Sequence, residues 1–177
     1  MTRKLISGLF VACLAVGIGG TSAGAWDAAG EQRAKEAIAE FKKADPGIDA
    51  FFSKAHGYAV FPEITKGAIG IGGAQGDGTV FEGGAAIGST SMSQVTIGLQ
   101  LGGQTYSEVI FFKDKAALDK FKGGDYEVAA GASAIALKDG VSKAAEYNNG
   151  VAIFTMGTGG LMFEASVGGQ KFSYEPK

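Results

Sequence analysis

Hydrophobic residues follow a helical period in the first part of the chain and a strand period after His56. Over 26–44, apolar residues recur every three or four positions, as on one face of an amphipathic helix; they are Ala34, Ala37, Ile38, Phe41 and Ala44. Asp45-Pro46-Gly47 should end this helix, because a residue before proline is disfavoured in the helical conformation. A second short helix is expected over 48–55.

The rest of the chain predicts mainly strands, separated by one clear helix. Strands are expected near 57–61, 67–74, 79–87, 93–103 and 106–112. A helix is expected over 113–122, ended by Gly123-Gly124. Later segments are predicted as strand or helix over 126–137, short helix or loop over 140–147, and a final hairpin of 150–156 with 161–174.

Two local features bear on strand ends. Asp77-Gly78 supplies residue types that favour a tight hairpin turn. Pro62 lacks an N–H group, so we expect it at a strand edge or a first strand position.

Glycine is unusually frequent in the predicted strands. Five of the 30 glycines precede Trp26, which leaves 25 in about 152 residues, roughly twice the usual fraction. Interspersed Ile, Val, Phe and Leu argue against disorder. Glycine inside strands marks bulges, bends or close backbone approach. The sequence therefore predicts an α+β fold, with a strongly curved, Gly-rich antiparallel sheet or a small barrel packed by N-terminal and internal helices.

Residues 1–25 have the pattern of a secretory signal peptide. A basic start precedes the apolar run 5–18, which is shorter than the ~20 residues that a membrane span needs. Ala23-Gly24-Ala25 forms a small-residue cleavage site. We expect cleavage after Ala25 and a single domain over 26–177, in the periplasm or secreted. Retention of the run as an N-terminal anchor is the alternative.

The expected mature chain lacks several kinds of chemistry. Cys13 lies inside the apolar run and should be removed with it; lipidation at Cys13 is the less favoured alternative. One histidine, His56, and no cysteine then remain, which excludes His/Cys metal clusters and thiolate chemistry. Because no G-x-S-x-G elbow is present, we expect His56 to cap or pack rather than catalyse.

We therefore expect no enzyme activity, no catalytic residue, no cofactor and no metal. Asp77 with Glu82 is the one suggestion of a carboxylate calcium site, and a turn explains Asp77 better.

Charge and motif spacing exclude two further classes of ligand. Removing Arg3 and Lys4 leaves 14 basic residues against 18 acidic ones, a formal net charge of −4. An acidic domain without a basic run is a poor nucleic-acid binder, so no nucleic-acid partner is expected. The glycines of 70–78 do not form a nucleotide loop, because Gln75 stands where G-x-G-x-x-G needs its third glycine.

Several motifs follow one another in a characteristic order from 55 onward. They are Ala55-x-Gly57-x-Ala59-Val60-Phe61-Pro62, Lys66-Gly67, Gly72-Gly73-x-x-Gly76-x-Gly78, Gly98-Leu99-Gln100-x-Gly102, Val109-Ile110-Phe111-Phe112, Ala117-Leu118-x-x-Phe121 and Gly131-Ala132-Ser133. This set resembles the signature of the SYLF-domain family, lipid-binding modules that include the yeast Las-seventeen-binding actin regulators and small exported bacterial proteins. The resemblance spans 28–173. The chain departs from the family pattern at 85–92, which lacks the Trp and Pro that members often carry.

The resemblance implies a non-enzymatic protein of the cell envelope that binds phospholipid at a membrane surface. The family's lipid contacts are attributed partly to the N-terminal region. Here the two N-terminal helices offer apolar and basic side chains for that role: Trp26, Arg33, Lys35, Phe41, Lys42, Lys43, Phe51 and Phe52. The periodicity leaves open whether this apolar stripe meets lipid or packs on the sheet.

A structural or partner-binding envelope protein is the alternative function. In that interpretation the sheet edge or the 85–92 segment, expected as a loop, docks another protein. Actin binding, known for eukaryotic relatives, is not carried over, because we expect this chain to be exported from a bacterium-like cell. No Src-homology, FYVE or other appended module is recognised.

Overall fold

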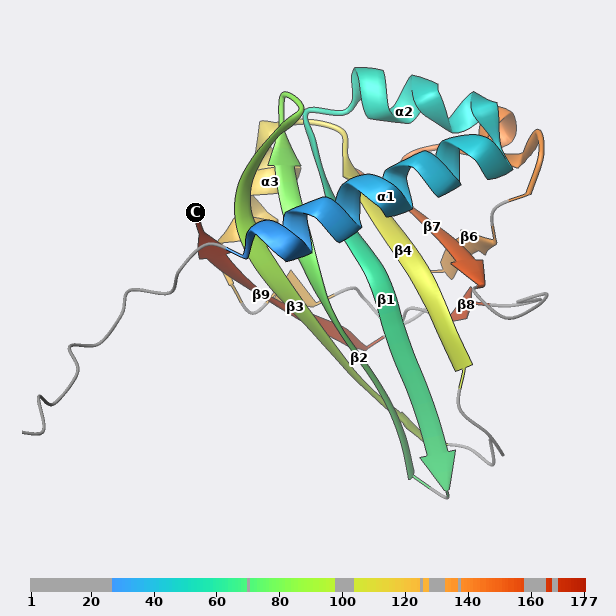
Figure 1. Cartoon of the computed structure of the whole chain (residues 1–177), viewed down its shortest axis with the longest axis vertical. Coiled ribbons are helices and arrows are strands. Elements are labelled where there is room, and N and C mark those ends of the chain that lie inside the picture. The colour runs from blue at the N-terminus through green and yellow to red at the C-terminus, as the bar shows by residue number, and fades with distance from the viewer. Residues whose placement is uncertain are drawn as a thin grey trace, which may run out of the picture.

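A computed structural model of the chain describes residues 27–69, 71–97, 104–124, 126–127, 133–136, 138–157, 165–166 and 169–177. They form an α+β fold in which helices lie on both faces of a curved, open sheet (Figure 1). The helical elements are α1 (Ala28–Ala44), η1 (Pro46–Ile48), α2 (Asp49–Lys54), α3 (Lys115–Lys122) and η2 (Val141–Ala144). The strands are β1 (Gly57–Ile69), β2 (Ile71–Glu82), β3 (Ala85–Ile97), β4 (Gln104–Phe112), β5 (Tyr126–Glu127), β6 (Ser133–Ala136), β7 (Val151–Gly157), β8 (Ala165–Ser166) and β9 (Gln170–Pro176).

The strands follow the order β5-β9-β3-β2-β1-β4-β7-β6-β8. The six strands from β9 to β7 pair antiparallel, and β6 lies parallel to β7. The outermost strands β5 and β8 are not paired with each other in the described part of the chain, so the sheet is open. The α+β prediction is confirmed, in its curved-sheet form.

The three predicted helices are present. In α1 the apolar stripe buries Ala34, Ala37 and Phe41 against the sheet. Asp45 follows in an extended conformation, and its Oδ1 accepts a hydrogen bond from the Gly47 amide at 2.9 Å. This side-chain cap is why the chain turns sharply into η1 and α2. None of the described helices is both long enough and apolar enough to span a bilayer.

Pro62 lies within the central strand β1, rather than at an edge or a first position. The register of β1 shifts between Val60 and Glu63 against β2, and between Phe61 and Ile64 against β4. A bulge leaves an amide out of the ladder, and a proline is tolerated there because it has no amide hydrogen to lose.

The turn prediction for Asp77-Gly78 is wrong, because both residues lie inside β2 and pair with Ser91 and Thr90. The tight turn between β2 and β3 uses Gly83 and Gly84, with φ of +59° and +84°. Two successive positive φ values suit glycine and produce the twist that joins neighbouring antiparallel strands.

Two further expectations are corrected. Residues 85–92 form the first part of β3 rather than a loop. The final strands do not make a hairpin with each other, because β7 pairs with β4 and β6, whereas β9 pairs with β3 and β5.

The buried residues form two clusters, one on each face of the sheet. One face packs under α1 and α2 and includes Tyr58, Val60, Phe81, Val109 and Phe111. The opposite face packs against α3 and includes Phe61, Ile110, Phe112, Leu118 and Phe121. Alternating residues of β1 and β4 therefore enter different cores, as the pleat of a strand requires.

Candidate functional site

The aromatic residues predicted to meet lipid belong largely to the core between helices and sheet. Phe41 is 0% exposed, so it is removed from the candidate lipid contacts. The half-buried Phe51 ring lies 5.0 Å from the Phe154 ring, and the half-buried Phe52 ring lies 4.8 Å from the Phe111 ring. Trp26 lies outside the described residues. These rings hold the helices on the sheet and leave little apolar surface for a bilayer.

Three of the four basic residues predicted to meet lipid have acidic partners. Arg33 pairs with Asp27 at 3.3 Å, and Lys35 pairs with Glu31 at 2.7 Å. The Lys42 ammonium lies 2.6 Å from Asp49 and 5.1 Å from the centre of the Phe52 ring. Lys43 is exposed. Residues 27–54 carry five basic and six acidic side chains, so this helical surface has no net positive charge to attract anionic lipid.

A groove of about 920 Å³ lies between the first turns of α1 and the neighbouring strands. Its lining includes the small residues Gly76, Gly78, Ser89, Ser91 and Ser173. Its charged members are Asp27, Arg33, Glu63, Asp77 and Glu175. With four carboxylates and one guanidinium, the groove repels a phosphate and suits polar or cationic groups.

His56 links the end of α2 to the sheet. Its Nε2 lies 2.9 Å from Glu82 Oε1, and Lys122 Nζ lies 3.9 Å from the other oxygen of Glu82. This arrangement fixes the start of β1. Asp77 and Glu82 lie five residues apart along β2, about 16 Å at ~3.3 Å per residue, so they do not share one ion. No cluster of three or more metal-ligating His, Cys, Asp or Glu occurs among the described side chains.

Among the described residues, the core on the α3 side of the sheet contains one buried carboxyl group, that of Glu108. It is fully buried, and burial raises its pKa to about 7, opposed by a hydrogen bond from Gln170 Nε2 to Oε2 at 3.3 Å. The other oxygen, Oε1, has no hydrogen-bond partner. Thr155 of β7 stands opposite Glu108 of β4 in the strand register, and its Oγ1 also has no hydrogen-bond partner. Burial also raises the pKa of the nearby Tyr106. Sequence reasoning missed this group, because a strand glutamate usually faces solvent.

Four neighbouring strands share a long uncharged part. The chain has no Asp, Glu, Lys or Arg over 67–76 or over 83–107. In the described part of the chain these stretches supply residues 67–69 of β1, 71–76 of β2, all of β3 and 104–107 of β4, which lie side by side. We call the outermost described part, Gly67–Ile69, Ile71–Ala74 and Val95–Ile97, the distal end. It contains Val95, which is 74% exposed.

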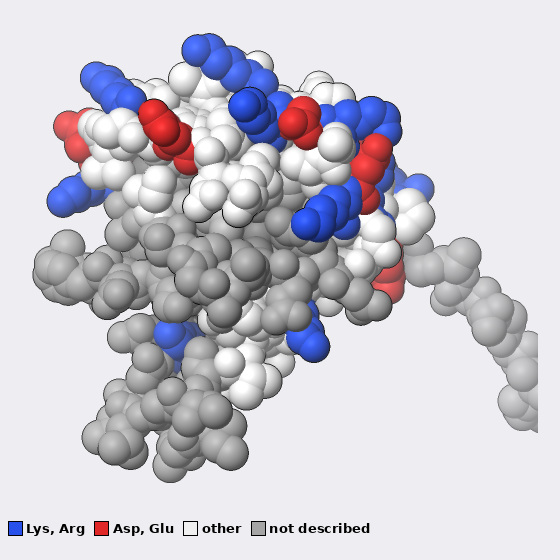
Figure 2. Space-filling view, turned by 180° about the vertical axis from the view of Figure 1, so that it is seen from behind, with Lys and Arg blue, Asp and Glu red and all other residues white. Residues whose placement is uncertain are grey.

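The distal end lies away from the helices in Figure 1. Figure 2 shows the molecule from behind, with blue and red side chains gathered over the helical end. Sequence reasoning missed this surface. The uncharged runs were visible in the sequence, but only the strand pairing brings them together.

Comparison with known proteins relates the chain to a described bacterial protein. No family model matches the chain. Over 130 residues the chain is 34% identical to Beta cell expansion factor A from Aeromonas veronii; the alignment covers 72% of this chain and 49% of that protein. The chain thus spans about half the length of this curated relative. The similarity supports a family relationship between the two proteins.

Proposed function

We propose that this chain is a SYLF-type, non-enzymatic protein of the cell envelope that binds phospholipid at a membrane surface. The observation that carries the proposal is the uncharged end of the sheet, with Val95 exposed on it. The motif resemblance and the expected export signal agree with this function. The name of Beta cell expansion factor A refers to an effect on cells and not to a ligand. Lipid binding is therefore proposed from the surface of this chain and not from the relative.

An uncharged run of this length is unusual in a soluble domain. About a quarter of residues in soluble domains are charged, so the 25 residues of 83–107 would ordinarily contain about six charges. Charged side chains are costly to place in a bilayer, whereas glycine, alanine, valine and isoleucine are tolerated there. A surface from which charge is absent over four neighbouring strands therefore fits contact with lipid.

The helical residues are not needed for this contact. Arg33, Lys35, Lys42 and Lys43 reach solvent, but the helices lie away from the uncharged end of the sheet, so a membrane docked at that end does not reach them. Phe51 and Phe52 are half-buried, and Trp26 remains a prediction from the sequence.

Vesicle co-sedimentation tests the proposal. The exported protein, purified after the producing cells have processed it, is mixed with vesicles of zwitterionic phospholipid, or of zwitterionic and anionic phospholipid together. We expect it to pellet with vesicles. Absence of binding to every envelope lipid would overturn the function. Capture of an envelope protein that is unaffected by added lipid would instead favour a partner-binding role, for which the acidic groove is the candidate surface.

A further inference from the structure

We propose that the protein meets the membrane end-on: the distal end enters the boundary between head groups and acyl chains, Lys66 and Lys171 lie at the level of the phosphates, and the helices face away. This inference rests on the proposed function, and it names the part of the molecule that enters the bilayer.

Polarity changes step by step along β1, β2 and β3. Residues paired across these three strands form rungs, and alternate rungs go from charged to polar to apolar towards the distal end. From the helical end outward they are Glu63–Asp77–Ser91, Thr65–Gln75–Ser93, Gly67–Gly73–Val95 and Ile69–Ile71–Ile97. The same order of polarity occurs from water through the head groups to the acyl chains of a bilayer.

The length of the distal end along the strands matches a shallow insertion into the bilayer. At about 3.3 Å per residue, the distance from Glu63 to Ile69 along β1 is ~20 Å, and that from Gly67 to Ile69 is ~7 Å. Elements that lie at the membrane interface bury their apolar part roughly 5–10 Å deep.

Val95 is exposed because its neighbours in the rung have no side chains. It pairs with Gly73, which pairs with Gly67. Among the described residues, a Cβ atom added at Gly67 would meet no atom within 4 Å, and one added at Gly73 would meet only the Gln94 carbonyl oxygen, at 3.3 Å. The described surface beside Val95 is therefore bare backbone. In water this leaves an apolar side chain uncovered, and contact with lipid relieves that cost.

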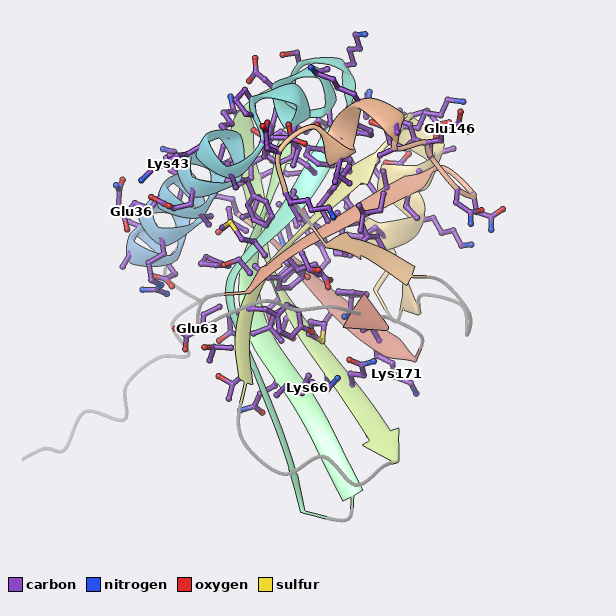
Figure 3. All side chains as sticks on the ribbon, turned by 90° about the vertical axis from the view of Figure 1, so that its right-hand side faces the viewer. Glu36, Lys43, Glu63, Lys66, Glu146 and Lys171 are labelled. Carbon is purple, nitrogen blue, oxygen red and sulfur yellow. The ribbon has the colours of Figure 1, made fainter. Side chains whose placement is uncertain are left out.

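Two lysines mark the boundary of the uncharged part. Lys66 is the last charged residue of β1, and Lys171 pairs with Ser93, one rung nearer the helices. Neither takes part in an ion pair with another described residue. In Figure 3, Glu63, Lys171 and Lys66 lie at successive heights above the lower ends of the long strands. Lysines in this position extend their ammonium groups to lipid phosphates while their stems follow the apolar surface.

A fluorescent probe tests the orientation directly. In a Cys13→Ser background, Val95→Cys is labelled with an environment-sensitive dye, and Ala39→Cys, at an exposed position of α1, is the matched control. On adding vesicles that contain anionic phospholipid, the dye at 95 should shift its emission to the blue and be quenched by lipids spin-labelled near the head group. The dye at 39 should keep its aqueous emission.

Charge variants supply the second measurement. Val95→Asp should weaken vesicle binding about tenfold or more, because a carboxylate at the boundary opposes insertion. Ala39→Asp adds the same charge at the helical end and should change binding little. Because Val95 is largely exposed, circular dichroism should show that both variants fold. Lys66→Gln with Lys171→Gln should reduce the preference for anionic vesicles and leave the blue shift at 95 in place.

The outcomes separate the two proposals. Binding to vesicles with an aqueous signal at 95, or with a blue shift at 39, would overturn end-on insertion and leave membrane binding in place. Failure of the unsubstituted protein to pellet with any vesicle would overturn the proposed function and this inference with it.

Discussion

Gln170 Nε2 donates a buried hydrogen bond to Glu108 Oε2 at a distance of 3.3 Å, on the face of the sheet that packs against α3. The bond satisfies one carboxyl oxygen and leaves the other, Oε1, without a partner. A buried carboxylate with one unpaired oxygen is costly, and this explains why burial raises the pKa of Glu108 to about 7. The interior is therefore sensitive to pH near neutrality.

Glu108→Gln should remove this pH dependence. The folded-state pKa of Glu108 lies above its ordinary value of 4.5, so the folded protein binds the proton more tightly than the unfolded chain does. The contribution of Glu108 to stability is complete below pH 4.5, falls as pH rises to about 7, and is constant above that. At pH 8 the glutamine variant should be more stable, by an amount on the order of 3 kcal/mol.

Urea unfolding at pH 5 and pH 8 measures this effect. Equal changes of unfolding free energy with pH in the variant and the unsubstituted protein would show that Glu108 is not the responsible group.

Asp45 should be one of the most sensitive acidic residues for stability. It is 1% exposed, and its two oxygens accept hydrogen bonds from the amides of Gly47 at 2.9 Å and Ser142 at 2.8 Å. Asp45→Ala leaves both amides without this acceptor and should lower the free energy of unfolding by roughly 2–4 kcal/mol. Asp49→Ala removes only an exposed partner of Lys42 and should cost less than about 1 kcal/mol.

Asp45 also predicts how the stability of the fold changes at acidic pH. Burial acts to raise the pKa of Asp45, but hydrogen bonds from Ser142, Gly47 and Gly140 outweigh it and the pKa is lowered. Its stabilisation is present above its ordinary value of 3.8 and is lost as pH falls through the lowered pKa. Acid titration of the Asp45→Ala variant should therefore lack that part of the stability loss. An acid transition identical to that of the unsubstituted protein would contradict the assignment.

Two glycines of the long strands should respond oppositely to the same substitution. A Cβ atom at Gly78 would lie 2.6 Å from the Val60 carbonyl oxygen and 2.8 Å from Cδ1 of Phe61. Gly78→Ala should therefore destabilise the fold by about 1–3 kcal/mol, because the neighbouring strand must move. Gly67→Ala meets open space and should be neutral or slightly stabilising. Thermal unfolding distinguishes them, and similar melting temperatures would show that close strand approach does not require glycine at Gly78.

We predict that the chain is exported and that the mature protein begins at Trp26. The apolar run 5–18 and the small residues at 23–25 fit removal by a signal peptidase. Intact-mass measurement of protein recovered after export checks this prediction. A chain that still begins at Met1, or one that carries lipid on Cys13, would contradict it.

The helices were predictable because their signals are local. Ala34, Ala37 and Phe41 recur at helical spacing, and the same residues are buried on the sheet. The periodicity could not show which surface covers them, and so Phe41 was assigned to lipid. The turn predicted at Asp77-Gly78 was wrong for a related reason. These residue types suit a turn, but the pairing of β2 with β1 and β3 determines their conformation.

The candidate surface required knowledge of strand order. An uncharged run such as 83–107 has no orientation by itself, and only the pairing of β1, β2, β3 and β4 places two such runs at one end. Small polar residues at 85–92 suggested a loop, because they carry little hydrophobic signal for a strand. Glu108 gave no sequence signal at all, since its burial depends on packing between distant strands.

The most direct test of membrane binding through the uncharged end compares the exported protein with its Val95→Asp variant in one co-sedimentation series against vesicles that contain anionic phospholipid. The unsubstituted protein should pellet with the vesicles, and the variant should remain largely in the supernatant while keeping its folded circular dichroism spectrum. Equal behaviour of the two proteins, whether both pellet or both stay in solution, would contradict the account.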